Sequence, residues 1–166
     1  MQDLKYISYV EEQNGIAEAV YLLEERLKSG GADKVTVLRL LFLYWFMEHE
    51  PAFFTNDNGS RDWTQSFRGL LEQTWNRFKE DSEYNWVAGY LLSQFPAQDM
   101  RRRGEEMQRE AVCLEPDSIL PDLFLHLARK EKFSLQGVHD LENRLADWGM
   151  LGDYLRHTLA GLGPDK

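Results

Sequence analysis

The chain has a single cysteine, Cys113, among its 166 residues, so no disulfide can form within it. The apolar neighbours Val112 and Leu114 predict that Cys113 is a buried small side chain and not a reactive thiol. Long apolar runs are also missing, because the most apolar segment, 40–47, is far shorter than the roughly 18 residues that a membrane span needs. The first residues show no basic and apolar secretory signal. Together these features predict a cytoplasmic protein that does not cross a membrane.

Positive charge is scarce. Lys and Arg number 19 against 28 Asp and Glu, which gives a formal net charge of −9. Nucleic acids and membrane surfaces are negative as well, so binding to either would need a basic patch that offsets the repulsion. The only dense basic run is 101–103, and Glu105 and Glu106 follow it closely, which is typical of a solvated helix face. We therefore expect no nucleic-acid or membrane partner, and a basic protein is the better electrostatic match.

Ready-made catalytic and metal sites are absent from the sequence. The four histidines never form the H-E-x-x-H spacing that places two imidazoles on one helix face. Segment 56–59 looks like part of a calcium loop, but the register would put Phe54 and Gln65 where carboxylates are needed. Nucleophile elbows and glycine-rich phosphate loops are missing too. Adjacent carboxylates such as Glu105 and Glu106 favour a solvated face over an acid–base pair. We expect no enzymatic activity, no cofactor and no metal site.

Apolar residues recur at spacings of three and four along most of the chain, which indicates amphipathic helices. Leu4, Ile7 and Val10 form one such stripe, and Ile16, Val20, Leu23 and Leu27 form another. Between residues 35 and 47 only Thr36 and Arg39 are clearly polar, so a helix here belongs at the centre of a bundle. The sequence predicts a single all-α domain, 1–166, of eight or nine helices, arranged as a helical bundle or as a stack of antiparallel hairpins. The glycine-containing segment 29–31 is expected to end the second helix, and Asp62, with Gln65 three residues on, to cap the fourth. The expected helices cover about 4–14, 16–27, 33–49, 63–78, 86–95, 99–114, 121–130, 135–148 and 151–162.

One segment resembles a tetratricopeptide repeat. Gly104, Ala111 and Pro116 have the spacing of the small residues and the proline late in that repeat. Small residues would let two helices approach closely, and the proline would end the second helix. Trp86 and Gly89 are the residue types expected in the first helix, but their register is about three residues off. This single unit leaves open an adapter that holds a peptide or a protein in a helical groove.

Two further stretches carry a resemblance to a protein family. The first is the apolar helix of 38–54 with its ending Glu-His-Glu-Pro-Ala-Phe-Phe, and the second is Trp-Val-Ala-Gly-Tyr-Leu-Leu-Ser-Gln-Phe-Pro at 86–96, which leads to 111–117. Together they resemble small helical immunity proteins of bacterial polymorphic toxin systems, including contact-dependent growth inhibition. The resemblance implies a cytoplasmic inhibitor that binds one cognate toxin domain. Such toxins are often nucleases with basic surfaces.

An acidic face could steer a basic toxin into a fast encounter and occupy its nucleic-acid groove. The candidate carboxylates lie on the first helices and around the loop near residue 55, and Phe53 and Phe54 would be apolar anchors. Alternatively, these two phenylalanines plug the end of the bundle. The predicted partner-binding residues are Glu11, Glu12, Glu24, Glu25, Glu48, Glu50, Phe53, Phe54, Asp57 and Asp62.

Overall fold

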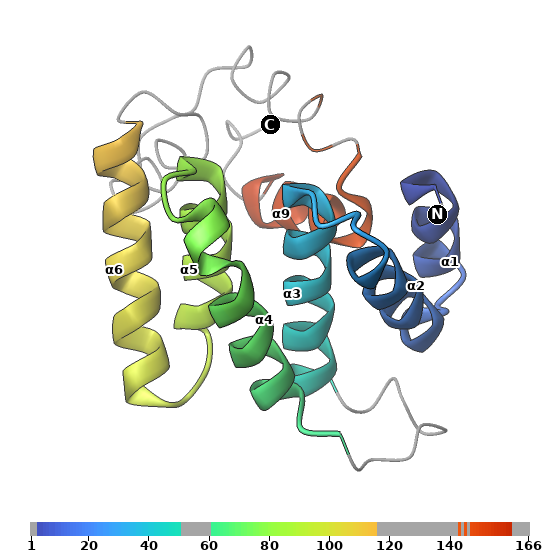
Figure 1. Cartoon of the computed structure of the whole chain (residues 1–166), viewed down its shortest axis with the longest axis horizontal. Helices are drawn as coiled ribbons and strands as arrows, with labels where there is room; N and C mark the ends of the chain where they lie inside the picture. The colour runs from blue at the N-terminus through green and yellow to red at the C-terminus, as the bar shows by residue number, and fades with distance from the viewer. Residues whose placement is uncertain (1–2, 51–60, 116–142, 144, 146, 161–166) are drawn as a thin grey trace. The chain divides into compact units, whose positions relative to one another are not determined.

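A computed structural model describes residues 3–50, 61–115, 143, 145 and 147–160, and their side chains as far as residue 157. Within these ranges the chain forms seven α-helices and no strand, so the expected all-α class is confirmed (Figure 1). Eight or nine helices were expected, but the expected helices at 121–130 and 135–148 fall almost entirely outside the described residues. The helices are α1 (Leu4–Glu12), α2 (Ile16–Lys28), α3 (Lys34–His49), α4 (Trp63–Phe78), α5 (Ser82–Ser93), α6 (Gln98–Leu114) and α9 (Gly149–Ala160).

The chain divides into two compact units. The first, unit 1, contains Met1–Arg77 and Gly149–Leu151, and the second, unit 2, contains Phe78–Trp148 and Gly152–Lys166. Unit 1 therefore holds α1, α2, α3 and nearly all of α4, together with the first residues of α9. Unit 2 holds α5, α6 and the rest of α9. No helix in the described part of the chain is long and apolar enough to span a membrane.

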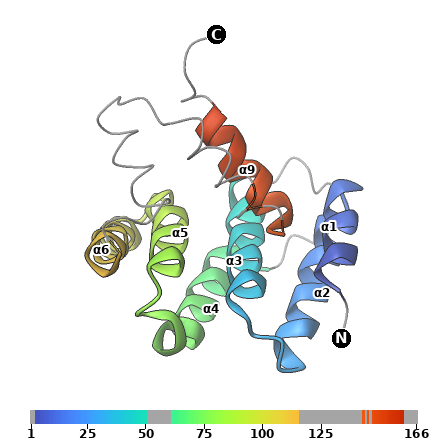
Figure 2. The ribbon, with the colours of Figure 1, turned by 90° about the horizontal axis from the view of Figure 1, so that it is seen from above.

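The central helix of unit 1 is α3, as its composition predicts. Every residue from Thr36 to Trp45 is buried, and the two polar residues Thr36 and Arg39 are buried with them. On α1 the buried apolar side chains are Ile7 and Val10, which belong to the predicted stripe. The α1–α2 hairpin and α3 lie side by side in both ribbon views (Figures 1 and 2). A helix apolar around its circumference is stable in water only when neighbours cover all its sides.

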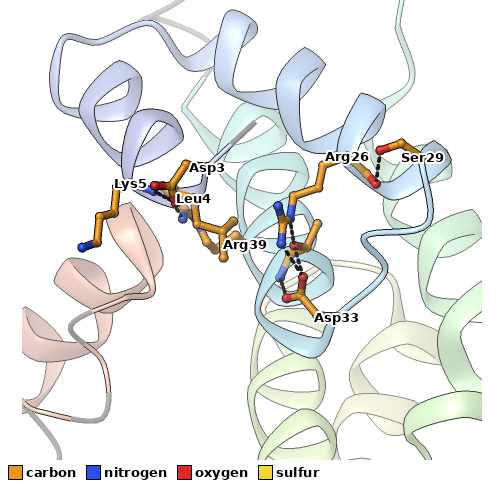
Figure 3. Close-up of polar contacts among 8 residues, drawn as sticks. Asp3, Leu4, Lys5, Arg26, Ser29, Asp33 and Arg39 are labelled. Atoms are coloured by element: carbon orange, nitrogen blue, oxygen red, sulfur yellow. Dashed lines mark hydrogen bonds and ion pairs between the residues drawn. The ribbon is translucent and has the colours of Figure 1, made fainter. Parts of the chain in front are cut away.

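The connection from α2 to α3 is held by a polar cluster at the start of α3. Asp33 caps this helix, since its carboxylate accepts hydrogen bonds from the Thr36 backbone N–H at 2.9 Å and the Thr36 hydroxyl at 2.8 Å. Arg26 reaches back from α2 to the same carboxylate at 3.1 Å and to the Thr36 hydroxyl at 2.9 Å (Figure 3). As predicted, α2 ends at the Ser-Gly-Gly segment, where Gly30 takes a left-handed φ of 90°.

In unit 2, α5 and α6 form a tightly packed antiparallel hairpin (Figures 1 and 2). A Cβ added at Gly104 would lie 2.5 Å from the Gly89 carbonyl oxygen and 2.6 Å from the Ser93 nitrogen. The two backbones therefore touch where the glycines face each other, which confirms the close approach predicted from Gly104 and Ala111. Helix α5 begins four residues before the predicted Trp86, because the Asp81 carboxylate caps it by accepting the Tyr84 N–H at 2.8 Å.

Candidate partner-binding surface

The ten residues predicted to bind a partner have different environments. Five are exposed carboxylates, and three others lie outside the described residues. The exposed residues are Glu12, Glu25, Glu48, Glu50 and Asp62. Those outside the described residues are Phe53, Phe54 and Asp57. Asp62 caps α4 by accepting the Gln65 N–H at 2.8 Å, as the sequence predicts. The remaining two, Glu11 and Glu24, take part in polar clusters within unit 1.

Glu11 lies inside unit 1 and not on its surface. Its carboxylate is 2.9 Å from the guanidinium of Arg39, and the two side chains are 2% and 1% exposed. The same carboxylate accepts the Met150 backbone N–H at 2.7 Å, near the start of α9. Arg39 also donates to the Leu4 carbonyl oxygen at 3.3 Å (Figure 3). Glu11 was predicted to lie on a partner-binding surface, but it points to the core because it shares a helix side with Ile7.

Glycine is required where α9 meets this ion pair. Gly149 has a φ of 54°, which side-chain-bearing residues adopt rarely. A Cβ at this position would also meet the Glu11 carboxylate and lie 2.7 Å from an Arg39 nitrogen. The ion pair thus ties α1, α3 and the start of α9 together, and it contributes to the structure of unit 1 rather than to its surface.

Glu24 is half-buried beside an arginine and two aromatic rings. Its Oε1 accepts the Tyr44 hydroxyl at 2.6 Å and an Arg61 N–H at 2.6 Å. The Arg61 guanidinium lies 5.0 Å from the ring centre of Tyr44 and 4.6 Å from that of Trp63. Burial, with the hydrogen bond and the negative charge of Glu24, raises the pKa of Tyr44 far above its usual value. Tyr44 therefore stays a neutral hydrogen-bond donor throughout the physiological pH range.

Among the described residues, the exposed large hydrophobic side chains are three tyrosines of α1 and α2. Tyr6, Tyr9 and Tyr21 are 47%, 57% and 60% exposed. Tyr6 and Tyr9 are three residues apart, so they share one side of α1, and the exposed Glu12 continues that stripe. Glu18 and Glu25 flank Tyr21 along α2 in the same way and are exposed as well. We call these two stripes of six residues the tyrosine surface.

The sequence contained a signal for this surface. Tyr9 lies outside the stripe that Leu4, Ile7 and Val10 define, and Tyr6 lies at its edge. Tyr21 follows Val20, which points about 100° away on an α-helix. A large aromatic residue outside the apolar stripe of an amphipathic helix is placed toward solvent. The predicted set of residues was chosen by charge and by loop position, so it missed the tyrosines.

Unit 2 offers charged helix surface and no second aromatic surface among its described residues. The basic run 101–103 on α6 is exposed, and nearby Arg109 pairs with Glu105 at 3.4 Å, which fits the predicted solvated face. Cys113 is exposed, so the expectation of a buried thiol was wrong. Near the end of α6 its side chain faces solvent, although its sequence neighbours are apolar.

The described residues contain no group of three or more His, Cys, Asp or Glu side chains placed to hold a metal ion. Comparisons of the chain with protein-family models, with curated proteins and with solved structures gave no significant match. The chemistry of these surfaces is therefore the basis on which a function can be proposed.

Proposed function

We propose that this protein binds a basic protein partner through the tyrosine surface and neutralises it, in the manner of an immunity protein that blocks a toxin domain. One observation carries the proposal: three tyrosines, each about half exposed, share their helix sides with exposed carboxylates on two neighbouring helices. Tyrosine is enriched in binding hot spots because its large ring buries area with little loss of conformational freedom while its hydroxyl forms a hydrogen bond.

Charge supports a basic partner. The chain carries a net charge of −9, and Glu12, Glu18 and Glu25 lie on the same helix sides as the tyrosines. Glu25 pairs with the exposed Lys28 at 2.9 Å, so the net negative charge of the tyrosine surface comes from Glu12 and Glu18. A partner that binds nucleic acid carries the complementary positive groove. An acidic protein seated in that groove would exclude the substrate by occupying its place.

A direct test identifies a secreted toxin whose gene lies beside the gene of this protein and uses the C-terminal domain of that toxin. The wild-type protein should bind this domain in isothermal titration calorimetry and abolish its toxicity when the two are co-expressed. The triple variant Tyr6→Ala, Tyr9→Ala, Tyr21→Ala should weaken binding by at least about 100-fold, the loss of two or more hot-spot contacts. A matched control, Arg102→Ala with Arg109→Ala on α6, should bind like the wild type.

Two outcomes would count against the proposal, and they are separable. If the wild-type protein neither binds nor protects against the toxin domain, the immunity function is wrong. If it binds but the triple variant, shown to be folded by circular dichroism, binds equally well, the function stands and the tyrosine surface is the wrong site.

A second candidate, a helical-hairpin adapter, is favoured by the glycine-packed α5–α6 pair. In that case the partner is a peptide or protein that lies along this hairpin. Hydrogen exchange of the complex separates the two candidates, because protection would appear on α5 and α6 in place of α1 and α2.

A further inference from the structure

Arg61 lies in a site that three other residues build around it. Glu24 on α2, Tyr44 on α3 and Trp63 at the start of α4 all contact its guanidinium, and we call these three residues the Arg61 cage. The centres of the Tyr44 and Trp63 rings are 5.9 Å apart and their planes are tilted by 36°, so the guanidinium lies over both faces. Glu24 accepts one of its N–H groups at 2.6 Å. A negative oxygen and two aromatic faces are the combination that recognises a planar cation.

The cage and its occupant are held very differently. Tyr44 is 5% exposed on the central helix, and its hydroxyl fixes the Glu24 carboxylate from the inner side. Arg61 precedes the first residue of α4 by two positions, and its side chain is 40% exposed. Besides the cage it contacts Ser66, whose hydroxyl accepts its Nε–H at 3.0 Å. The three cage residues therefore belong to helices α2, α3 and α4. Arg61 precedes α4 and reaches the cage from the solvent side.

We propose that the Arg61 cage is a guanidinium-binding site, and that an arginine side chain of the basic partner takes the place of Arg61 in the complex. That the arginine comes from a basic partner rests on the proposed function. That the cage binds a guanidinium group does not. Exchange of one arginine for another keeps the Glu24 carboxylate paired and both ring faces covered. Arg61, already partly exposed, moves into solvent. An ammonium group would fit less well, because it cannot stack flat on the rings.

The resident Arg61 also makes the site selective. The chain holds Arg61 beside the cage, so Arg61 competes as an intramolecular ligand and free arginine at cellular levels displaces it poorly. An arginine presented by a docked partner is also tethered and competes on equal terms. The site then opens when the rest of the partner is already in contact with the protein.

The test replaces Arg61, which fills the cage, and adds a small guanidinium compound as a probe. Arg61→Ala should bind ethylguanidinium with a Kd on the order of 10 mM, as expected for one partly exposed ion pair with cation–π contacts. Binding is followed by the shift of the Trp63 indole N–H signal in NMR spectra, which is assigned by its loss in Trp63→Phe. The wild type, with its cage filled, should bind at least about tenfold more weakly. Ethylurea, which has nearly the same shape without the charge, should leave the signal unchanged.

Two further variants isolate the cage. Adding Glu24→Gln to Arg61→Ala should weaken ethylguanidinium binding about tenfold, because the carboxylate is lost. Arg102→Ala removes an exposed arginine of α6 that has no aromatic cage, and it should behave like the wild type. If Arg61→Ala does not fold, Arg61→Gln keeps the chain length and removes the charge, and it is tested in the same way.

The proposal is overturned if a folded Arg61 variant shows no saturable shift of the Trp63 signal, or if ethylurea shifts it equally. This result is independent of the toxin experiment. Should the protein fail to bind a toxin domain while the cage binds ethylguanidinium, the proposed function fails and the site remains. If the toxin binds and the cage does not, the function stands and the site is refuted.

Discussion

The buried pair of Glu11 and Arg39 allows a sharp prediction about stability. Replacing Arg39 with Met keeps most of the side-chain volume but leaves the Glu11 carboxylate inside unit 1 without its cation. Both side chains are at most 2% exposed, so water cannot solvate the remaining charge without local opening. Removing one partner of a buried ion pair costs about 3–5 kcal/mol. This range includes the cost of losing the 3.3 Å hydrogen bond from Arg39 to the Leu4 carbonyl oxygen.

The double variant Glu11→Met, Arg39→Met should cost much less than two single substitutions. It removes both charges, and it leaves the Met150 N–H and the Leu4 carbonyl without these partners, a loss of about 1–3 kcal/mol. Arg39 Nε has no hydrogen-bond partner among the described residues, so the native pair is itself incompletely satisfied. The two single effects should therefore fail to add by at least about 2 kcal/mol.

Urea unfolding followed by far-ultraviolet circular dichroism measures these free energies. For a chain of this size, a loss of about 4 kcal/mol should lower the Tm by roughly 10 °C. Arg102→Met is the matched control, because Arg102 is 77% exposed and 4.0 Å from Glu106, and it should change stability by less than about 0.5 kcal/mol. A cost below about 1 kcal/mol for Arg39→Met, or strictly additive single effects, would refute the argument from burial.

Three further outcomes follow from the structure. Gly104→Ala should destabilise by about 1–3 kcal/mol in urea unfolding, because its Cβ would strike the Gly89 carbonyl 2.5 Å away. Gly69→Ala on α4 meets open space and should be neutral or stabilising by up to about 1 kcal/mol. Burial acts to raise the pKa of Asp33, but its hydrogen bonds outweigh burial and hold this pKa below 3.8. Asp33 therefore contributes stability that is full above pH 3.8 and is lost as the pH falls through its folded pKa, and in an acid titration of stability Asp33→Asn should lack this component. Cys113 should react with a thiol reagent in the folded protein nearly as fast as in urea, and strong protection would contradict its exposure.

The immunity function and the acidic partner-binding residues remain predictions. The structure changes the set of residues that we expect to contact the partner. Glu11 is withdrawn into the core, Glu24 is engaged by Tyr44 and Arg61, and the tyrosine surface is added. The tyrosines give an acidic face the apolar anchors that carboxylates alone do not supply, since charges contribute more to encounter rate than to the lifetime of a complex.

Much of the helical architecture can be read from the sequence, because it depends on local periodicity. The stretch 35–47 of α3, apolar except for Thr36 and Arg39, predicted a central helix because exposing any side of it to water would be unfavourable. Asp62 predicted the start of α4 through a cap that involves only its near neighbours. Gly104 predicted a close helix contact, because a missing Cβ has that consequence wherever a second helix lies against it.

The environments of the candidate site residues could not be predicted, because they depend on contacts between residues distant in the sequence. Nothing near Glu11 shows that Arg39 will meet it, and a carboxylate without that cation would have been solvated. Cys113 is exposed although its neighbours are apolar, so the composition of the segment around it did not determine which way its side chain faces. Arg61 contacts Glu24, Tyr44 and Trp63 because α2, α3 and the start of α4 pack together. The sequence alone determined which segments become helices, and the tertiary structure decided which charges are buried, because the pairing of a charge depends on what lies opposite it in space.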